Sequence, residues 1–171
     1  HVSLVIGGEV AYGDGYGDTL YLPFFENYFA GGIRSVRGFR QNSIGPKGID
    51  CRLVDQDDGN GGTITTRICT ADYSIGGNSK FQGRTELVFS NPFDEAPSRN
   101  FRLSAFIDFA RVYTNIDSVA IVPDDRLRAS YGIGAVWITP VGALNFSLAW
   151  PLISYEGDRT ESFAFNIGSP F

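Results

Sequence analysis

The stretch Phe-Arg-Leu-Ser-Ala-Phe-Ile-Asp-Phe-Ala at residues 101–110 decides the fold class, because it alternates between two kinds of side chain. One phase is apolar throughout and consists of Phe101, Leu103, Ala105, Ile107 and Phe109. The other phase is mixed and consists of Arg102, Ser104, Phe106, Asp108 and Ala110. Successive side chains of a β-strand point to opposite faces, so this period of two predicts a strand with one apolar and one mixed face.

The same alternation returns in other segments of the chain. It predicts further strands over residues 2–12, roughly 78–90, 127–137, 144–150 and 162–167. No segment has the 3.6-residue period of a convincing helix. The sequence therefore predicts an all-β, antiparallel architecture of about six strands.

The composition favours a membrane barrel over a soluble β-protein. Of the 171 residues 21 are Gly, 14% are aromatic and only 19% are charged. The mixed phase is rich in Gly, Ser and Ala, and aromatic side chains lie near strand ends. Both features are typical of transmembrane barrels, which face lipid outside and enclose a water-filled lumen. A soluble sandwich or a lipocalin-like barrel is the alternative, with the apolar phase turned inward. No apolar run approaches the ~20 residues of a transmembrane helix, and none resembles a signal peptide.

The connectors between the predicted strands are of two lengths, as the two ends of an outer-membrane barrel require. Residues 139–142 read as a tight turn and 91–98 as a short link, whereas 114–125 and 13–77 are long. Residues 155–160 are the exception, because they are short although they fall on the side of the long connectors. If the C-terminus is periplasmic, the long connectors lie outside the cell.

The longest connector carries the most specific motif in the chain. It contains Pro-Phe-Phe-Glu-Asn-Tyr-Phe-Ala-Gly-Gly at 23–32, Val-Arg-Gly-Phe at 36–39 and Ile-Gly-Pro at 44–46. This run resembles the sixth extracellular loop of the BamA family, the bacterial outer-membrane β-barrel assembly factors. The ending Phe-Ala-Phe-Asn-Ile-Gly at 163–168 is similar to the last strand of that family.

The resemblance extends along essentially the whole chain and implies an architecture. Residues 1–171 would form the C-terminal part of the family's sixteen-strand barrel, with the extracellular loop at 13–77 inserted into the lumen. About six strands are fewer than the eight of the smallest closed membrane barrels, so N-terminal barrel strands and periplasmic domains are expected to be absent from this chain. The alternative is a complete eight-stranded barrel with two further strands within 19–77.

Arg37 is the residue of the loop motif with the clearest chemistry. Its planar guanidinium can pair with carboxylates, and the mixed phases of two predicted strands offer Glu86 and Asp108. The resemblance implies the same two lumen partners. Gly38 removes side-chain bulk so that the loop can approach the wall, while Val36 and Phe39 can anchor it by burial. The alternative for Arg37 is an exposed side chain in a solvated loop.

Two cysteines lie in the outer part of the same loop. Cys51 and Cys69 in an exported protein are predicted to form a disulfide, with two free thiols as the alternative. No metal site and no cofactor are expected, because the loop aspartates lack the spacing of an EF-hand. The single histidine, His1, lies at the terminus, which also leaves no histidine-based catalytic site.

The last predicted strand ends the chain in one apolar register formed by Phe163, Phe165, Ile167 and Phe171. Gly168 weakens the strand and permits a kink. The resemblance implies that this strand forms a lateral seam with the first barrel strand, where incoming strands are templated. The alternative is a strand that simply closes a barrel.

The function implied by the resemblance is the assembly and insertion of β-barrel proteins into the bacterial outer membrane, without enzymatic activity. The implied partners are outer-membrane lipids, unfolded β-barrel clients and periplasmic accessory lipoproteins. A nucleic-acid partner is not expected, since the net charge is −5. The alternatives are a polypeptide secretion translocator of the same superfamily and a simple porin-like barrel.

Overall fold

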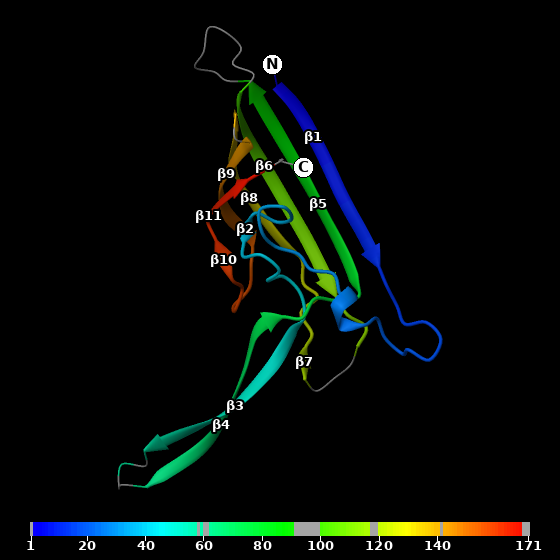
Figure 1. Ribbon diagram of the computed structural model, residues 1–171, viewed down its shortest axis with the longest axis vertical. Helices are drawn as coiled ribbons and strands as arrows, with labels where there is room; N and C mark the ends of the chain where they lie inside the picture. Colours follow the sequence, from blue (N-terminus) through cyan, green and yellow to red (C-terminus); the bar gives the residue numbers. More distant parts are fainter. Residues whose placement is uncertain are drawn as a thin grey trace.

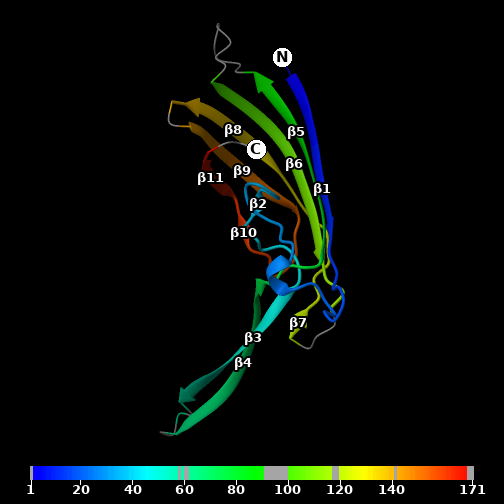
Figure 2. The same cartoon turned by 45° about the vertical axis from the view of Figure 1, so that its right-hand side comes forward.

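The fold is one curved antiparallel sheet with a long loop on its concave side (Figures 1 and 2). The computed structural model describes residues 2–57, 59, 62–90, 100–116, 120–140 and 142–168. The predicted link 91–98 therefore lies outside the described residues, as does Phe171. The sheet has six strands, in the order β1 (Val2–Tyr12), β5 (Ser79–Ser90), β6 (Phe101–Tyr113), β8 (Arg128–Thr139), β9 (Gly142–Ile153) and β11 (Phe163–Ile167).

The strand order in this sheet follows the chain order, and each neighbouring pair is antiparallel. The all-β prediction is therefore confirmed, and the six strands lie close to the predicted ranges. Among the described residues, no helix is long and apolar enough to cross a membrane.

The two faces of the sheet differ as the alternation predicts. Ile107, Tyr131 and Phe165 of the apolar phase are 50%, 46% and 46% exposed. The opposite phase of the same strands lies beneath the loop, where Asp108 and Ser130 are fully buried. The apolar phase does not form a dry centre, so the soluble alternative does not describe this chain.

The connector at 13–77 has more structure than a plain loop. It contains a 3₁₀ turn, η1 (Phe24–Glu26), and a two-residue strand, β2 (Gly38–Phe39). It also contains a hairpin, β3 (Lys47–Asp57) and β4 (Thr63–Ser74), which the alternation did not predict.

This hairpin projects away from the main sheet (Figure 1). It pairs with the short β7 (Ile121–Val122) in a separate three-stranded sheet and not with the six-stranded one. Two strands within 19–77 therefore exist, but they do not complete an eight-stranded barrel. The physical reason is composition, since both faces of the ribbon carry exposed polar side chains: Thr65 and Asp55 on one face, and Thr66 and Gln56 on the other.

The last predicted strand, 162–167, is interrupted at its start. The chain bends at Ser162, and the preceding β10 (Thr160–Glu161) pairs with β2 in the loop. Only β11, from Phe163, continues the ladder on β9. The terminal strand therefore contacts both the wall and the loop.

Candidate functional site: the loop motif and the terminal strand

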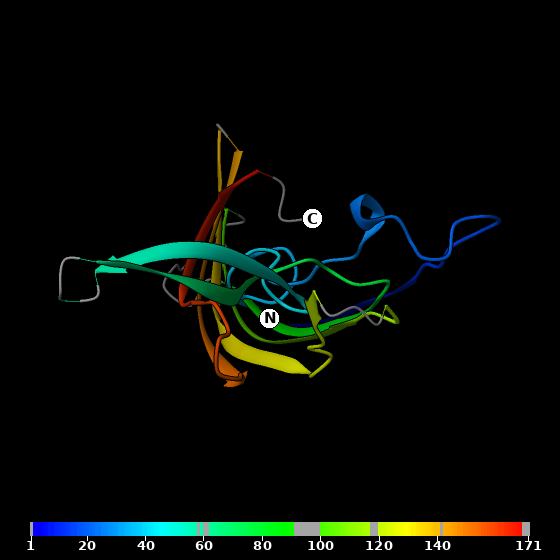
Figure 3. The same cartoon turned by 90° about the horizontal axis from the view of Figure 1, so that it is seen from below.

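The loop motif, defined here as Val36–Phe39, lies inside the curve of the sheet. Seen from below, the chain before and after β2 folds back toward the concave face (Figure 3). Val36 and Phe39 are buried in one apolar cluster with Ala30, Ile44, Ala110 and Val112. The cluster joins the loop to β6, so apolar burial fixes the motif on the wall.

Arg37 reaches both carboxylates named from the sequence. Its Nε and Nη2 donate to the two carboxylate oxygens of Asp108 at 2.7 and 2.9 Å, and Nη1 donates to Glu86 Oε1 at 3.3 Å. The backbone N–H of Arg37 also donates to Asp108, at 3.2 Å. Arg37 is 8% exposed and Asp108 is fully buried, so this is a buried bidentate ion pair.

The wall supplies two further contacts around this ion pair. The ring of Phe106 lies beneath the guanidinium, with its centroid 3.4 Å from Arg37 Cζ. Ser104 donates a short hydrogen bond to the carboxylate oxygen of Glu86 that also accepts from Arg37. The cation–π contact with Phe106 holds the Arg37 guanidinium in place, and the Ser104 hydroxyl holds the Glu86 carboxylate in place.

The electrostatic balance of the site keeps Arg37 charged. Burial alone lowers the pKa of this guanidinium, but the hydrogen bonds and charge of Asp108, and then those of Glu86, raise its pKa above the ordinary value. Because two carboxylates surround its guanidinium, Arg37 stays protonated at any pH near neutral.

Gly38 lets the motif touch the wall formed by β8 and β9. Its backbone has φ of +90°, a conformation that favours glycine. A Cβ at this position would lie 3.1 Å from Cβ of Ala149 and 3.3 Å from Cβ of Ser130. Both the backbone angle and the close approach therefore require a residue without a side chain.

The loop motif also contacts the terminal strand through its backbone. Phe39 lies opposite Thr160, and Gly38 lies opposite Glu161. Beyond this pair, the N–H of Arg40 donates to the carbonyl of Arg159 at 2.8 Å. The motif thus connects the wall at β5 and β6 with the end of the chain.

The predicted seam residues lie where the sheet ends. Phe163, Phe165 and Ile167 are exposed on β11, which pairs with β9 on one side. Among the described residues, no strand pairs with the other edge of β11. Gly168 follows the strand with φ of +138°, and its N–H donates to Ala143 at 2.9 Å.

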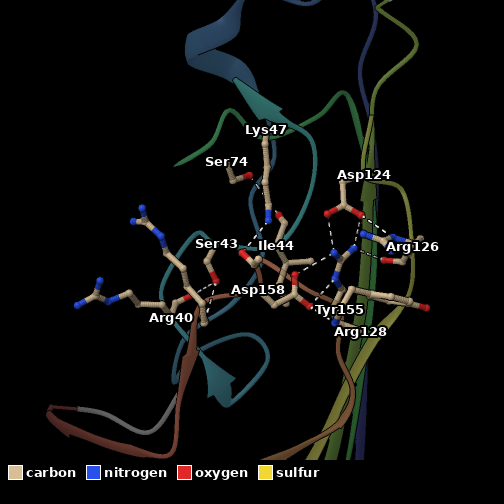
Figure 4. A network of polar contacts seen from close by, with 12 residues as sticks. Arg40, Ser43, Ile44, Lys47, Ser74, Asp124, Arg126, Arg128, Tyr155 and Asp158 are labelled. Carbon is tan, nitrogen blue, oxygen red and sulfur yellow. Dashed lines mark hydrogen bonds and ion pairs between the residues drawn. The ribbon is translucent and has the colours of Figure 1, made fainter. Parts of the chain in front are cut away.

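A second buried ion cluster lies at the outer rim of β8 (Figure 4). This rim cluster consists of Asp124, Arg126, Arg128, Tyr155 and Asp158. Nη1 and Nη2 of Arg128 both donate to Asp124, and Nε and Nη2 donate to Asp158. With a further bond from Nη1 to the Arg126 carbonyl, every N–H of this fully buried guanidinium has a partner.

The rim cluster joins three connectors. Asp124 precedes β8, whereas Asp158 belongs to the turn between β9 and β10. In that same turn, the carbonyl of Gly157 accepts a 2.8 Å bond from Lys47 Nζ at the start of β3. These contacts therefore hold the three connectors together.

Cys51 and Cys69 form a disulfide, as predicted. They lie directly opposite each other in the β3–β4 ladder. The disulfide therefore fastens the projecting hairpin and is remote from the Arg37 ion pair.

Sequence reasoning missed Phe106 and the rim cluster. Phe106 had a signal, since it is the aromatic side chain in a phase otherwise made of small or charged residues. Arg128 lies in a mixed strand phase, but Asp158 lies in a short polar turn with nothing to distinguish it. The contact between Arg128 and Asp158 depends on the folded path of the connectors before β8 and after β9, and no local sequence pattern encodes that path.

Comparisons with known proteins agree on one family. A family model described as the Omp85 superfamily domain matches residues 1–171. The outer membrane protein assembly factor BamA of Neisseria meningitidis serogroup B is 32% identical over 190 residues, covering 99% of this chain and 22% of that protein. The BamA of Neorickettsia risticii is 27% identical over 141 residues, covering 81% and 16%.

A solved structure shows the same likeness in three dimensions. The crystal structure of BamA from Haemophilus ducreyi lacking POTRA domains 1–3 matches with a TM-score of 0.75 and 33% identity. The match covers 96% of this chain and 30% of that chain. This chain therefore spans less than a third of the length of these relatives.

Proposed function

Because the chain belongs to the Omp85 superfamily, we propose that it is the terminal part of an outer-membrane β-barrel that assembles other β-barrel proteins into that membrane. The observation that carries this proposal is the loop motif, which Arg37 anchors to Asp108 and Glu86 of the wall, in a chain that is 32% identical to an outer membrane protein assembly factor.

The proposed mechanism is strand addition along the side of β11 that does not pair with β9. The exposed apolar phase of the sheet faces lipid, which holds the edge at the depth where a client strand has to form its hydrogen bonds. An unfolded client offers its own unpaired backbone groups and adds to β11 by β-augmentation. The client leaves when its own last strand closes on its first strand, which replaces the pairing with β11.

The role proposed for Arg37 is to hold the loop motif, and so to support the wall from inside. Its ion pair joins the loop to β5 and β6, while Gly38 joins it to β8 and β9. The proposed partners are outer-membrane lipids and unfolded β-barrel clients, together with periplasmic lipoproteins that the family resemblance implies.

Reconstitution tests the proposed function. Liposomes that contain the protein should accelerate folding of a urea-denatured client barrel relative to empty liposomes, measured by the electrophoretic shift of the folded client. Ion conductance without faster client folding would reject assembly and favour a polypeptide translocator or a porin.

A further inference from the structure

The turn that leads into the terminal strand, residues 154–158, is not paired into the main sheet. β9 ends at Ile153, and the chain rejoins the ladder on β9 only at Ser162, whose carbonyl accepts from the N–H of Ala149. Between these points β10 pairs with β2 of the loop, which packs over the concave face at Gly38. The position of the turn therefore depends on contacts outside the ladder.

Arg128, the first residue of β8, holds this turn through Asp158 (Figure 4). Its Nε and Nη2 donate to the two carboxylate oxygens of Asp158 at 3.2 and 2.9 Å. The same carboxylate accepts from the N–H of Tyr155 at 2.8 Å, so Asp158 both closes the turn and ties it to β8. Both side chains of the ion pair are buried, so each charge depends on the other for its compensation.

On its other side, Arg128 is joined to the base of the projecting hairpin. Nη1 and Nη2 of Arg128 donate to Asp124, which follows β7 by two residues. β7 pairs with Lys47 and Gly48 at the start of β3. Lys47 Nζ then donates to the carbonyl of Gly157 in the turn, at 2.8 Å. The turn, the start of β8 and the base of the hairpin are therefore one connected unit.

The two carboxylates of the rim cluster differ in their supply of cations. Asp124 also accepts from Arg126 Nε at 3.1 Å, so it keeps a cation when Arg128 is removed. Among the described residues, Arg128 is the only cation paired with Asp158. Loss of Arg128 therefore leaves one buried carboxylate without a cation, and it is the one in the turn. Because an unpaired buried charge is costly, the turn has to move to bring this carboxylate to water.

We propose that Arg128 is a positioning residue for the terminal strand: by holding Asp158, it fixes where residues 159–161 lie against the loop motif. The carbonyl of the first of these residues accepts from the N–H of Arg40, so a shift of the turn is passed directly to the contact with the loop. Arg37 anchors the loop motif separately, on the wall. The inference rests on the proposed function, because a misplaced start of the terminal strand affects clients only if that strand guides them.

Amide exchange separates the two anchors in the reconstituted protein. Arg128→Met should raise exchange at least about tenfold at Tyr155, in the turn, and at Arg40, opposite the start of the terminal strand. Exchange of the Arg37 N–H should stay unchanged, since its bond to the wall does not involve the rim cluster. Unchanged exchange at Arg40 would overturn the proposal, and so would an equal rise at Arg37.

Two further variants keep the test decisive if Arg128→Met folds poorly. Asp158→Ala removes the anchor from the turn but leaves Arg128 paired with Asp124, and it should also raise exchange at Arg40. Arg128→Met combined with Asp158→Asn removes the unpaired charge, so exchange at Arg40 should be slower than in Arg128→Met alone. Equal exchange in the single and the combined variant would show that Arg128 does not act through Asp158. Arg111→Met removes an exposed pair and is the control that should change none of these rates.

A covalent tether tests the positioning itself. Arg40 and Arg159 are exposed antiparallel partners, and such pairs have Cα atoms about 5.5 Å apart, within disulfide range. In liposomes, Arg128→Met should fold a client at least about threefold more slowly than the unsubstituted protein, because the strand start is misplaced. With Arg40→Cys and Arg159→Cys added, oxidation should restore the rate of the same cysteine pair with Arg128 intact, and reduction should remove the gain.

The tether separates a loss of position from a loss of stability. If the oxidised pair does not restore client folding in Arg128→Met, the loss is one of stability and the proposal is overturned. Client folding by Arg128→Met at the unsubstituted rate would overturn it too, as would failure of the pair to crosslink with Arg128 intact. Absence of client folding by the unsubstituted protein rejects the proposed function instead, and exchange at Arg40 still decides whether Arg128 positions the strand.

Discussion

At the scale of single residues, Arg37 is the side chain on which the loop depends most. Arg37→Met leaves the buried Asp108 carboxylate without a cationic partner and with only the backbone N–H of residue 37, and the expected loss of stability is about 3 kcal/mol. The loop should become accessible to protease, which is measured by the rate of cleavage within residues 23–46 in detergent. The matched control is Arg111→Met, because Arg111 forms an exposed pair with Asp125 and its removal should cost under about 1 kcal/mol. Equal protection of the loop in both variants would contradict the anchoring role.

Gly38 gives a second residue-scale prediction. Gly38→Ala should destabilise the docked loop by about 1–3 kcal/mol, since it meets both an unfavourable φ and the side chains of Ala149 and Ser130. Gly17→Ala is the control, because Gly17 also has positive φ but no atom within 4 Å of an added Cβ. Thermal unfolding followed by circular dichroism separates the two costs, and equal shifts in both variants would show that the wall contact contributes nothing.

The rim cluster predicts a pH dependence outside the membrane. Burial raises the pKa of Asp124, but the hydrogen bonds from Arg128 and Arg126 outweigh it and lower the pKa below the ordinary value. A lowered carboxylate pKa contributes stability that is present above the unfolded value, about 4, and is lost as pH falls through the folded value. Amide exchange at residues 155–158 should therefore increase below about pH 4. In Asp124→Asn this step should disappear, and its persistence would assign the effect to another group.

At the scale of elements, the six wall strands could be predicted because each carries its own period-two signal, as residues 101–110 show. The pairing of Arg37 with Asp108 could be predicted because the strand phase already placed Asp108 opposite the apolar face. The β3–β4 hairpin could not, because polar residues such as Thr65 and Thr66 occur in both phases of β4 and its strands are held by backbone pairing. The bend at Ser162 was missed for a related reason, since the pattern of 162–167 does not reveal that 160–161 pairs elsewhere.

The hairpin gives a prediction at this scale. Reducing Cys51–Cys69, or replacing both cysteines by Ser, should destabilise β3 and β4 by roughly 3 kcal/mol in the chain-entropy model. Amide exchange should rise in Lys47–Asp57 and Thr63–Ser74 but not in β5 or β6, because the two sheets share no ladder. Increased exchange in β6 would show that the hairpin supports the wall.

At the scale of the whole molecule, the exposed apolar phase is the surface that the bilayer has to cover. Ile107 lies at the middle of β6 and is half exposed, so Ile107→Lys should destabilise the protein in lipid by about 2–4 kcal/mol. The control Ile64→Lys changes an equally exposed isoleucine on the projecting hairpin and should cost little. Denaturant unfolding in vesicles compares the two, and equal costs would contradict a lipid-facing sheet.

The coincidence of strand order and chain order also has a kinetic consequence. From β5 onward, each wall strand can add to the strand made just before it, whereas β1 pairs with β5 across the whole connector at 13–77. The loop motif also depends on distant partners, because the partners of Arg37 lie 49 and 71 residues further along the chain and Gly38 contacts Ala149 later still. Docking of the loop motif therefore needs β5, β6, β8 and β9 in place, so it should follow the formation of these strands during refolding.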